Sequence, residues 1–179
     1  SMSIGNLRFV DSMSFVNGGL GKLAGYLPNE KKRLTTEHFK GRFNEEQLNL
    51  LMSKGMYPYQ WITTVDKFKE TNPPPREAFY NDLTAKECSE KDYEVFLKLW
   101  HTIGCKTFYD YHKVYLELDV VLLADIFENF RELMLNSHKL DPCYYFSLPH
   151  YTWDAMLYYS RVELELYTDE EMYKWTERG

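Results

Sequence analysis

The spacing of apolar and polar positions predicts a chain built mainly from helices. The longest apolar-periodic run begins near Thr107 and continues to about His138, and Asp141-Pro142 follows its expected end. Thr107 and Asp110 have the spacing of a capping box, which would satisfy the free amides at the start of this helix. One long helix is therefore expected in the second half of the chain.

The same reasoning predicts shorter elements on both sides of the long helix. Ser89 with Asp92 resembles a second capping box, and Gly104 is suited to end the helix that follows it. Alternation predicts a strand over 7–11. Further helices are expected over 20–27, 44–53 and 153–161 and from Thr168, with a brief turn or helix over 61–68 and extended chain over 72–75.

Composition fits one domain of the α+β class that is rich in helix. The chain has 179 residues, of which 44% are hydrophobic and 17% aromatic, enough for a substantial core. No apolar run is long enough for a membrane span and no signal-peptide pattern is present, so no membrane partner and an intracellular location are expected. The three cysteines are widely spaced, which favours reduced thiols over a zinc site.

A formal charge of −6 argues against a protein that binds duplex DNA regardless of sequence. The one basic cluster comprises Lys31, Lys32 and Arg33, followed by Lys40 and Arg42. A solvated loop is the favoured interpretation. The alternative, a platform for single-stranded nucleic acid, requires aromatic residues interleaved with the basic ones.

Tyr115 and Asp119 form the most informative pair of residues. Positions four apart share a face of a helix, and Leu122 and Ile126 continue that face. A carboxylate on a face that is otherwise apolar needs a partner or a metal ion. Glu117 and Asp125 turn away from this face and are expected to be solvated or capping charges.

The segment around this pair, Lys113-Val-Tyr115-Leu-Glu-Leu-Asp119-Val-Val-Leu-Leu-Ala-Asp125-Ile-Phe127-Glu, resembles the third exonuclease motif of family B DNA polymerases. The closest resemblance is to the protein-primed branch of phages, linear plasmids and Maverick/Polinton transposons. Five further segments, in order, are similar to that branch: Phe9-Val-Asp11-Ser-Met-Ser-Phe15, Lys54-Gly-Met-Tyr-Pro58-Tyr59, Pro74-Pro75-Arg-Glu-Ala-Phe-Tyr80, Gly104-Cys-Lys-Thr107 and Trp153-Asp-Ala155.

The resemblance implies a two-metal 3′–5′ exonuclease site that needs Mg²⁺ or Mn²⁺ in the complete domain. It assigns Asp119 to metal ligation, Tyr115 to orienting the attacking water, and Lys54 to contact with phosphate, although Lys54 could equally be a helix-terminal lysine. Asp11 is the remaining candidate metal ligand. The Asp-x-Glu of the family's first motif has no counterpart upstream, and the second motif has only a faint one at Asn6 to Asp11.

The expected fold is a partial ribonuclease H-like exonuclease domain with a long motif-bearing helix, whose sheet further N-terminal strands would complete. Residues 1–143 would be the C-terminal portion of that domain, and 144–179 the junction to a polymerase palm. Such a fragment is expected to be inactive alone. Its partners would be a single-stranded DNA 3′ end, its own polymerase domain and a terminal protein primer. The alternative is a domesticated, transposon-derived helical module that acts in protein–protein interaction.

Overall fold

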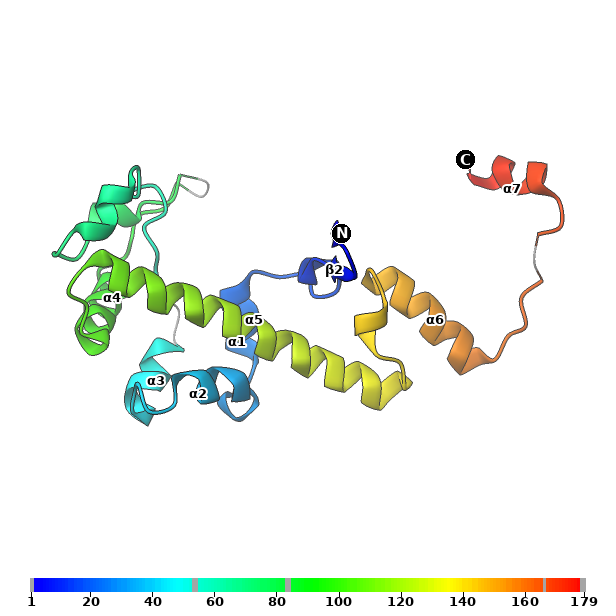
Figure 1. Cartoon of the computed structure of the whole chain (residues 1–179), viewed down its shortest axis with the longest axis horizontal. Helices are drawn as coiled ribbons and strands as arrows, with labels where there is room; N and C mark the ends of the chain where they lie inside the picture. The colour runs from blue at the N-terminus through cyan, green and yellow to red at the C-terminus, as the bar shows by residue number, and fades with distance from the viewer. Residues whose placement is uncertain (1, 53–54, 83–84, 166, 178–179) are drawn as a thin grey trace. The chain divides into compact units, whose positions relative to one another are not determined.

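The computed structural model describes residues 2–52, 55–82, 85–165 and 167–177. The chain is α+β and rich in helix, with 61% of it helical and one two-stranded sheet, which confirms the general fold class expected from the sequence. The elements, shown in Figure 1, are β1 (Met2–Ile4), β2 (Leu7–Phe9), α1 (Leu20–Tyr26), α2 (Arg33–Phe39), α3 (Glu45–Leu51), α4 (Glu90–Ile103), α5 (Phe108–His138), α6 (Leu148–Ser160) and α7 (Glu170–Glu177), with 3₁₀ turns η1 (Ser12–Ser14), η2 (Asn29–Lys31), η3 (Val65–Lys69), η4 (Arg76–Phe79) and η5 (Pro142–Tyr144).

The chain forms two compact units. One is Val16–Phe130, and the other combines Ser1–Phe15 with Arg131–Gly179, so helix α5 begins in the first and ends in the second. These compact units do not coincide with the segments 1–143 and 144–179, whose boundary follows from the family resemblance. The boundary between residues 143 and 144 stays a prediction.

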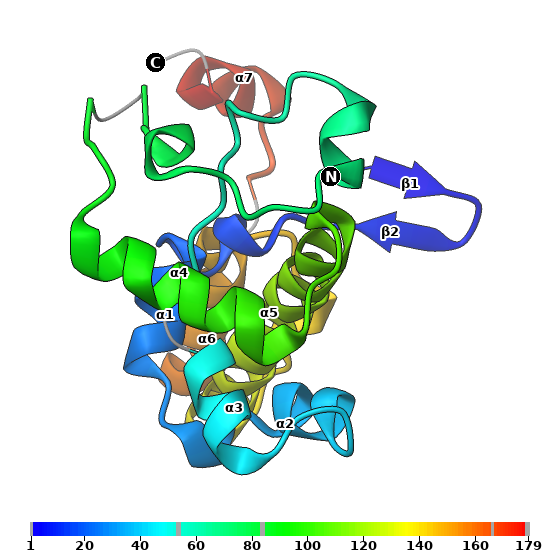
Figure 2. The same cartoon turned by 90° about the vertical axis from the view of Figure 1, so that its left-hand side faces the viewer.

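The Val16–Phe130 unit has its core along one stripe of α5. In Figures 1 and 2, α4 lies against the first turns of α5, and α2 and α3 lie below both helices. Phe108, Leu118, Leu122 and Ile126 of α5 are buried, as the apolar spacing of the sequence predicts. The residues that complete this core come from every helix of the unit: Ala24, Phe39, Leu48, Leu51, Phe79, Cys88, Phe96, Leu99, Trp100, Tyr111 and Val114.

The ends of α4 follow the sequence prediction closely. The Ser89 hydroxyl accepts a hydrogen bond from the Asp92 N–H and donates to the Asp92 carboxylate. Gly104 ends the helix at φ 72°, the left-handed conformation that glycine adopts without the steric cost of a Cβ. Local chemistry is thus sufficient to set both ends of this helix.

The first turn of α5 forms one half of its predicted capping box. The Asp110 carboxylate accepts from the N–H of Lys106 and of Thr107, each at 2.9 Å. The Thr107 hydroxyl donates to the same carboxylate at 3.3 Å rather than accepting from the helix. Asp110 therefore satisfies two amides just before the helix, while the first helical amide, that of Phe108, donates to the Glu70 carbonyl at 2.8 Å.

The prediction of a solvated loop holds only in part for the basic cluster. Arg33 begins helix α2, and Lys32 is buried with its amine donating to Asn29 at 3.0 Å, whereas Lys31, Lys40 and Arg42 are exposed. The N-terminus of α2 is capped from a distant part of the sequence. The two oxygens of the buried Asp125 carboxylate accept from the N–H of Leu34 at 2.8 Å and of Thr35 at 2.9 Å. Of the two roles expected for Asp125, capping is the one observed.

Helix α3 forms as predicted. The Asn44 side chain accepts from the Gln47 N–H, and the Gln47 side chain accepts from the Asn44 N–H, which completes a capping box. The helix ends at Leu51, two residues before the expected end, and Ser53 lies outside the described residues.

The strand predicted over 7–11 is present as Leu7–Phe9, but it pairs in an antiparallel hairpin with Met2–Ile4. Gly5, at φ 58°, starts the two-residue turn between them. Both strands are exposed, so within the described residues this sheet is a surface hairpin and not a layer on which helices pack.

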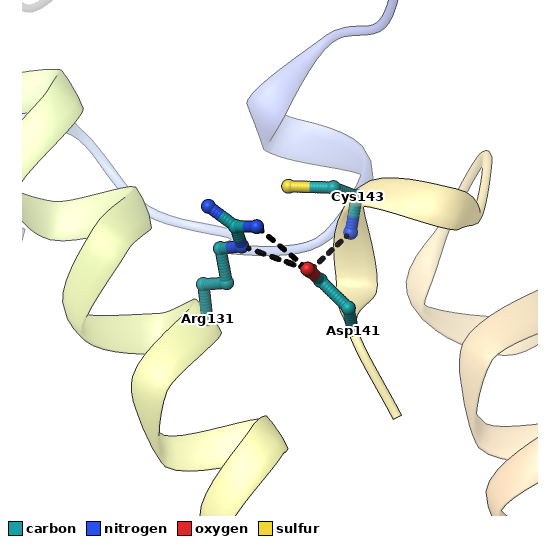
Figure 3. Close-up of polar contacts among 3 residues, drawn as sticks. All are labelled: Arg131, Asp141 and Cys143. Atoms are coloured by element: carbon teal, nitrogen blue, oxygen red, sulfur yellow. Dashed lines mark hydrogen bonds and ion pairs between the residues drawn. The ribbon is translucent and has the colours of Figure 1, made fainter. Parts of the chain in front are cut away.

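The second unit is held together around the end of α5. The Arg131 guanidinium binds the Asp141 carboxylate through two nitrogens, at 2.6–3.1 Å, and the same carboxylate accepts from the Cys143 N–H at 3.0 Å (Figure 3). The hydrogen bonds from Arg131 hold the pKa of Asp141 below its usual range. This arrangement fixes the turn between α5 and η5 by charge-assisted hydrogen bonds.

The last two helices begin at other residues than the sequence suggests. Helix α6 starts at Leu148 rather than Trp153, because Pro149 in its first turn has the backbone angle a helix requires and loses no hydrogen bond there. Asp169, not Thr168, accepts from the N–H groups of Glu171 and Met172 before α7.

Replacing Asp125 with alanine should destabilise the Val16–Phe130 unit by about 1–3 kcal/mol, because two amides at the start of α2, one of them that of the buried Thr35, lose their acceptor. The change is measured as a loss of unfolding free energy in denaturant. Glu94→Ala removes an exposed carboxylate from α4 and should change stability little. Equal effects of the two substitutions would show that the Asp125 contact contributes nothing.

Candidate functional site

Tyr115 and Asp119 lie side by side on α5, as their spacing predicts. The Tyr115 hydroxyl lies near the Asp119 carboxylate and favours its ionised form. Both side chains are half-buried at the edge of the stripe formed by Leu118 and Leu122. The structure thus brings the two central candidate residues together, while their roles in catalysis stay a prediction.

Three further aromatic rings surround Tyr115. The ring centroids of Tyr57 and Tyr111 lie 4.6 Å and 6.2 Å from that of Tyr115. The hydroxyl oxygens of Tyr59 and Tyr115 are 3.4 Å apart. The Tyr111 hydroxyl donates to the Met56 carbonyl at 2.6 Å, which attaches the chain that carries Tyr57 and Tyr59 to α5.

Gly55 permits the close approach of that chain to α5. A Cβ at this position would lie 3.3 Å from the Tyr115 ring, closer than most van der Waals contacts. A larger residue here would push the Tyr115 ring by a few tenths of an ångström, so glycine is favoured by space rather than by an unusual backbone angle. The residue positions the segment 55–59 directly against the candidate tyrosine.

A pocket of about 580 Å³ opens beside this aromatic cluster. Tyr115 and Tyr57 form part of its wall, and the 70% exposed Tyr59 lies at its edge. The lining also includes polar side chains: Gln60, Asn81, Lys86, Glu87 and Asp92. The pocket offers both flat apolar surface and hydrogen-bonding groups, the usual combination in a ligand site.

Burial controls the ionisation of the site. It raises the pKa of Asp119, and the hydrogen bond from Tyr115 opposes that rise. Burial likewise raises the pKa of Tyr115, and it raises the pKa of Tyr57 to about 12. Both phenols therefore remain neutral hydrogen-bond donors near pH 7.

Within the described residues, Asp119 has no cationic partner and belongs to no group of three potential metal-binding side chains. Its chemistry suits Mg²⁺ or Mn²⁺, which prefer oxygen ligands. A single carboxylate does not hold such an ion tightly. Asp119 therefore fits the role of one ligand, and the described residues do not complete a metal site.

The other two candidates are found outside the part of the structure that carries Tyr115 and Asp119 or outside the described residues. Asp11 is an exposed residue of the second unit, and its carboxylate accepts from the Met13 N–H at 2.9 Å, where it caps η1. Lys54 lies outside the described residues. Its neighbour Gly55 is the residue that packs against Tyr115.

Glu117 has a structural role on the other side of the helix. Its carboxylate accepts from the Arg42 guanidinium and lies 3.3 Å from His38 Nε2. It is thus an ion-paired charge rather than a freely solvated one. Of the residues that sequence reasoning did not assign, Tyr57 and Tyr59 stand out, and both lie in the motif that begins at Lys54.

Comparison of the chain with known protein families, curated proteins and solved structures found no match. The family resemblance thus depends on the motifs alone. In the described part of the chain, no helix combines the length and apolar character needed to cross a membrane.

The raised pKa of Asp119 gives the site a defined pH dependence. The folded pKa lies above the unfolded value of about 3.9, so the folded state binds more protons between these two values. Wild-type stability should therefore fall, relative to Asp119→Asn, as pH rises through the folded pKa. At pH 7 the substitution should leave the melting temperature unchanged or higher.

Carboxyl-carbon NMR titration checks this shift directly. Tyr115→Phe removes the hydroxyl that favours the ionised carboxylate, and should raise the pKa of Asp119 further. Asp141, whose pKa is lowered by Arg131, serves as the control, and its titration should not respond to Tyr115→Phe. An Asp119 that titrates at or below about 3.9 would contradict the burial argument.

Proposed function

We propose that the chain is part of the 3′–5′ exonuclease region of a protein-primed family B DNA polymerase, with Asp119 as one of its metal-binding carboxylates. The observation that supports this most is the half-buried Asp119, which has a hydroxyl partner but no cation among the described residues. A buried carboxylate is costly without compensation. Metal ligation would supply that compensation in the complete site.

Tyr115 would act as a positioning residue. Its hydroxyl favours the ionised form of Asp119 and lies 3.4 Å from the Tyr59 hydroxyl. Because the pKa of Tyr115 is raised by burial, the phenol stays protonated and can orient a water molecule or a phosphate oxygen. The bound metal would supply the activation of water in this chemistry.

The metal itself needs more ligands than the described residues provide. A two-metal exonuclease site uses several carboxylates, and only Asp119 is present in this cluster. We therefore propose that further carboxylates lie elsewhere in the functional protein. The ribonuclease H-like sheet, the junction role of 144–179, and the polymerase-domain and terminal-protein partners belong to the same proposal.

A helical protein-interaction module is the second candidate. It is favoured by the large aromatic side chains exposed on the segment 144–179, where Tyr144, Tyr159 and Trp175 are each more than 80% exposed. Exposed aromatic residues are common in protein interfaces. Under this alternative Asp119 has no metal to bind, so the test below separates the two.

In the protein that carries this chain with the remaining carboxylates, Asp119→Asn should slow digestion of single-stranded DNA from its 3′ end by roughly 100-fold or more. Folding should persist, because removing the charge also removes its burial cost. Tyr115→Phe should have a milder effect. Rates are measured with Mg²⁺ or Mn²⁺ on end-labelled DNA, alongside a thermal melt of each variant.

Glu117→Gln is the matched control, since it makes the same charge change on α5 in a residue paired with Arg42. It should leave turnover per folded molecule near the wild-type value. The chain by itself should show no digestion. Wild-type activity in Asp119→Asn, or loss of activity only through unfolding, would refute the catalytic assignment.

A further inference from the structure

A second pocket, of about 510 Å³, is lined by basic residues from separate parts of the Val16–Phe130 unit. Arg42 comes from the loop after α2, Lys106 from the chain just before α5, and Lys113 from the second turn of α5. The rest of the lining comprises Phe43, Ile103, Gly104, Asp110 and Val114. Folding thus gathers three cations that are scattered in an acidic chain.

The two lysines are available to a ligand. Both are exposed, and no hydrogen bond or ion pair to either amine is found among the described residues. Arg42 is held in place by its ion pair with Glu117 and by the Phe39 ring, whose centroid lies 5.2 Å from the guanidinium carbon. An arginine has five N–H donors, so this ion pair leaves most of them unused.

Two carboxylates lie near these cations and reduce their charge. Asp110 lines the pocket, but its Oδ2 already accepts from the backbone N–H groups of Lys106 and Thr107 and from the Thr107 hydroxyl. The hydrogen bond from the Thr107 N–H holds the pKa of Asp110 below its usual range, so it stays ionised. The three cations together with Asp110 and Glu117 have a net charge of +1, whereas the whole chain has a net charge of −6.

We infer that this pocket binds a phosphate group. Phosphate carries up to two negative charges and several acceptor oxygens, which match one guanidinium and two mobile ammonium groups. Lys113 and Tyr115 project about 200° apart around α5. The phosphate pocket is thus separate from the Tyr115/Asp119 face, and the inference does not depend on the proposed nuclease function.

Two sources of phosphate share this chemistry: the free ion and the phosphates of single-stranded DNA. Titration of the full chain with inorganic phosphate, at constant ionic strength in chloride, should shift the amide NMR signals of residues 104–114. A short oligothymidylate, with and without a 5′-phosphate, forms the second arm. Competition between it and inorganic phosphate would identify nucleic acid as a source.

The Lys106→Gln/Lys113→Gln double variant should weaken phosphate binding by at least about tenfold, because two charge-assisted hydrogen bonds are lost. The Lys91→Gln/Lys98→Gln variant makes the same charge change on α4 and should bind normally. Asp119→Asn should also bind normally, which separates this inference from the nuclease proposal. No signal shift with either ligand, or equal binding by the Lys106/Lys113 variant, would overturn the inference.

Discussion

The hydrogen bonds from the Leu34 and Thr35 amides to the Asp125 carboxylate connect two parts of the fold that are about 90 residues apart in sequence. Helix α2 has only seven residues, and a helix this short is unstable in water by itself. A negative charge at its N-terminus satisfies two free amides and interacts favourably with the positive end of the helix dipole. The position of α2, and with it that of the loop carrying Arg42, depends on this contact.

Asp119 and Asp125 lie on the same helix, yet their surroundings give them opposite properties. Asp125 is 2% exposed and has two backbone donors, which compensate its burial. Asp119 is less buried but has a single hydroxyl donor, and its pKa is raised. Burial alone therefore does not identify a candidate ligand. The number and kind of donors around the carboxylate is the better indicator.

Features set by neighbouring residues could be predicted from the sequence. The ends of α4, the capping box of Asn44 and the pairing of Tyr115 with Asp119 all arise within four residues. Helix α2 was missed because its capping carboxylate comes from Asp125, far along the chain. The strand over 7–11 was found but its hairpin partner was not, since Met2–Ile4 is too short to show an alternating pattern.

The contact between Gly55 and Tyr115 restricts how the tyrosine can move. With the Gly55 backbone and the Tyr57 ring both packed against it, the Tyr115 ring has little room to change rotamer. The entropy of fixing this side chain is therefore lost when the chain folds and not when a ligand arrives. A hydroxyl held in this way is pre-organised. A binding partner that contacts it therefore loses less binding free energy to the ordering of this side chain.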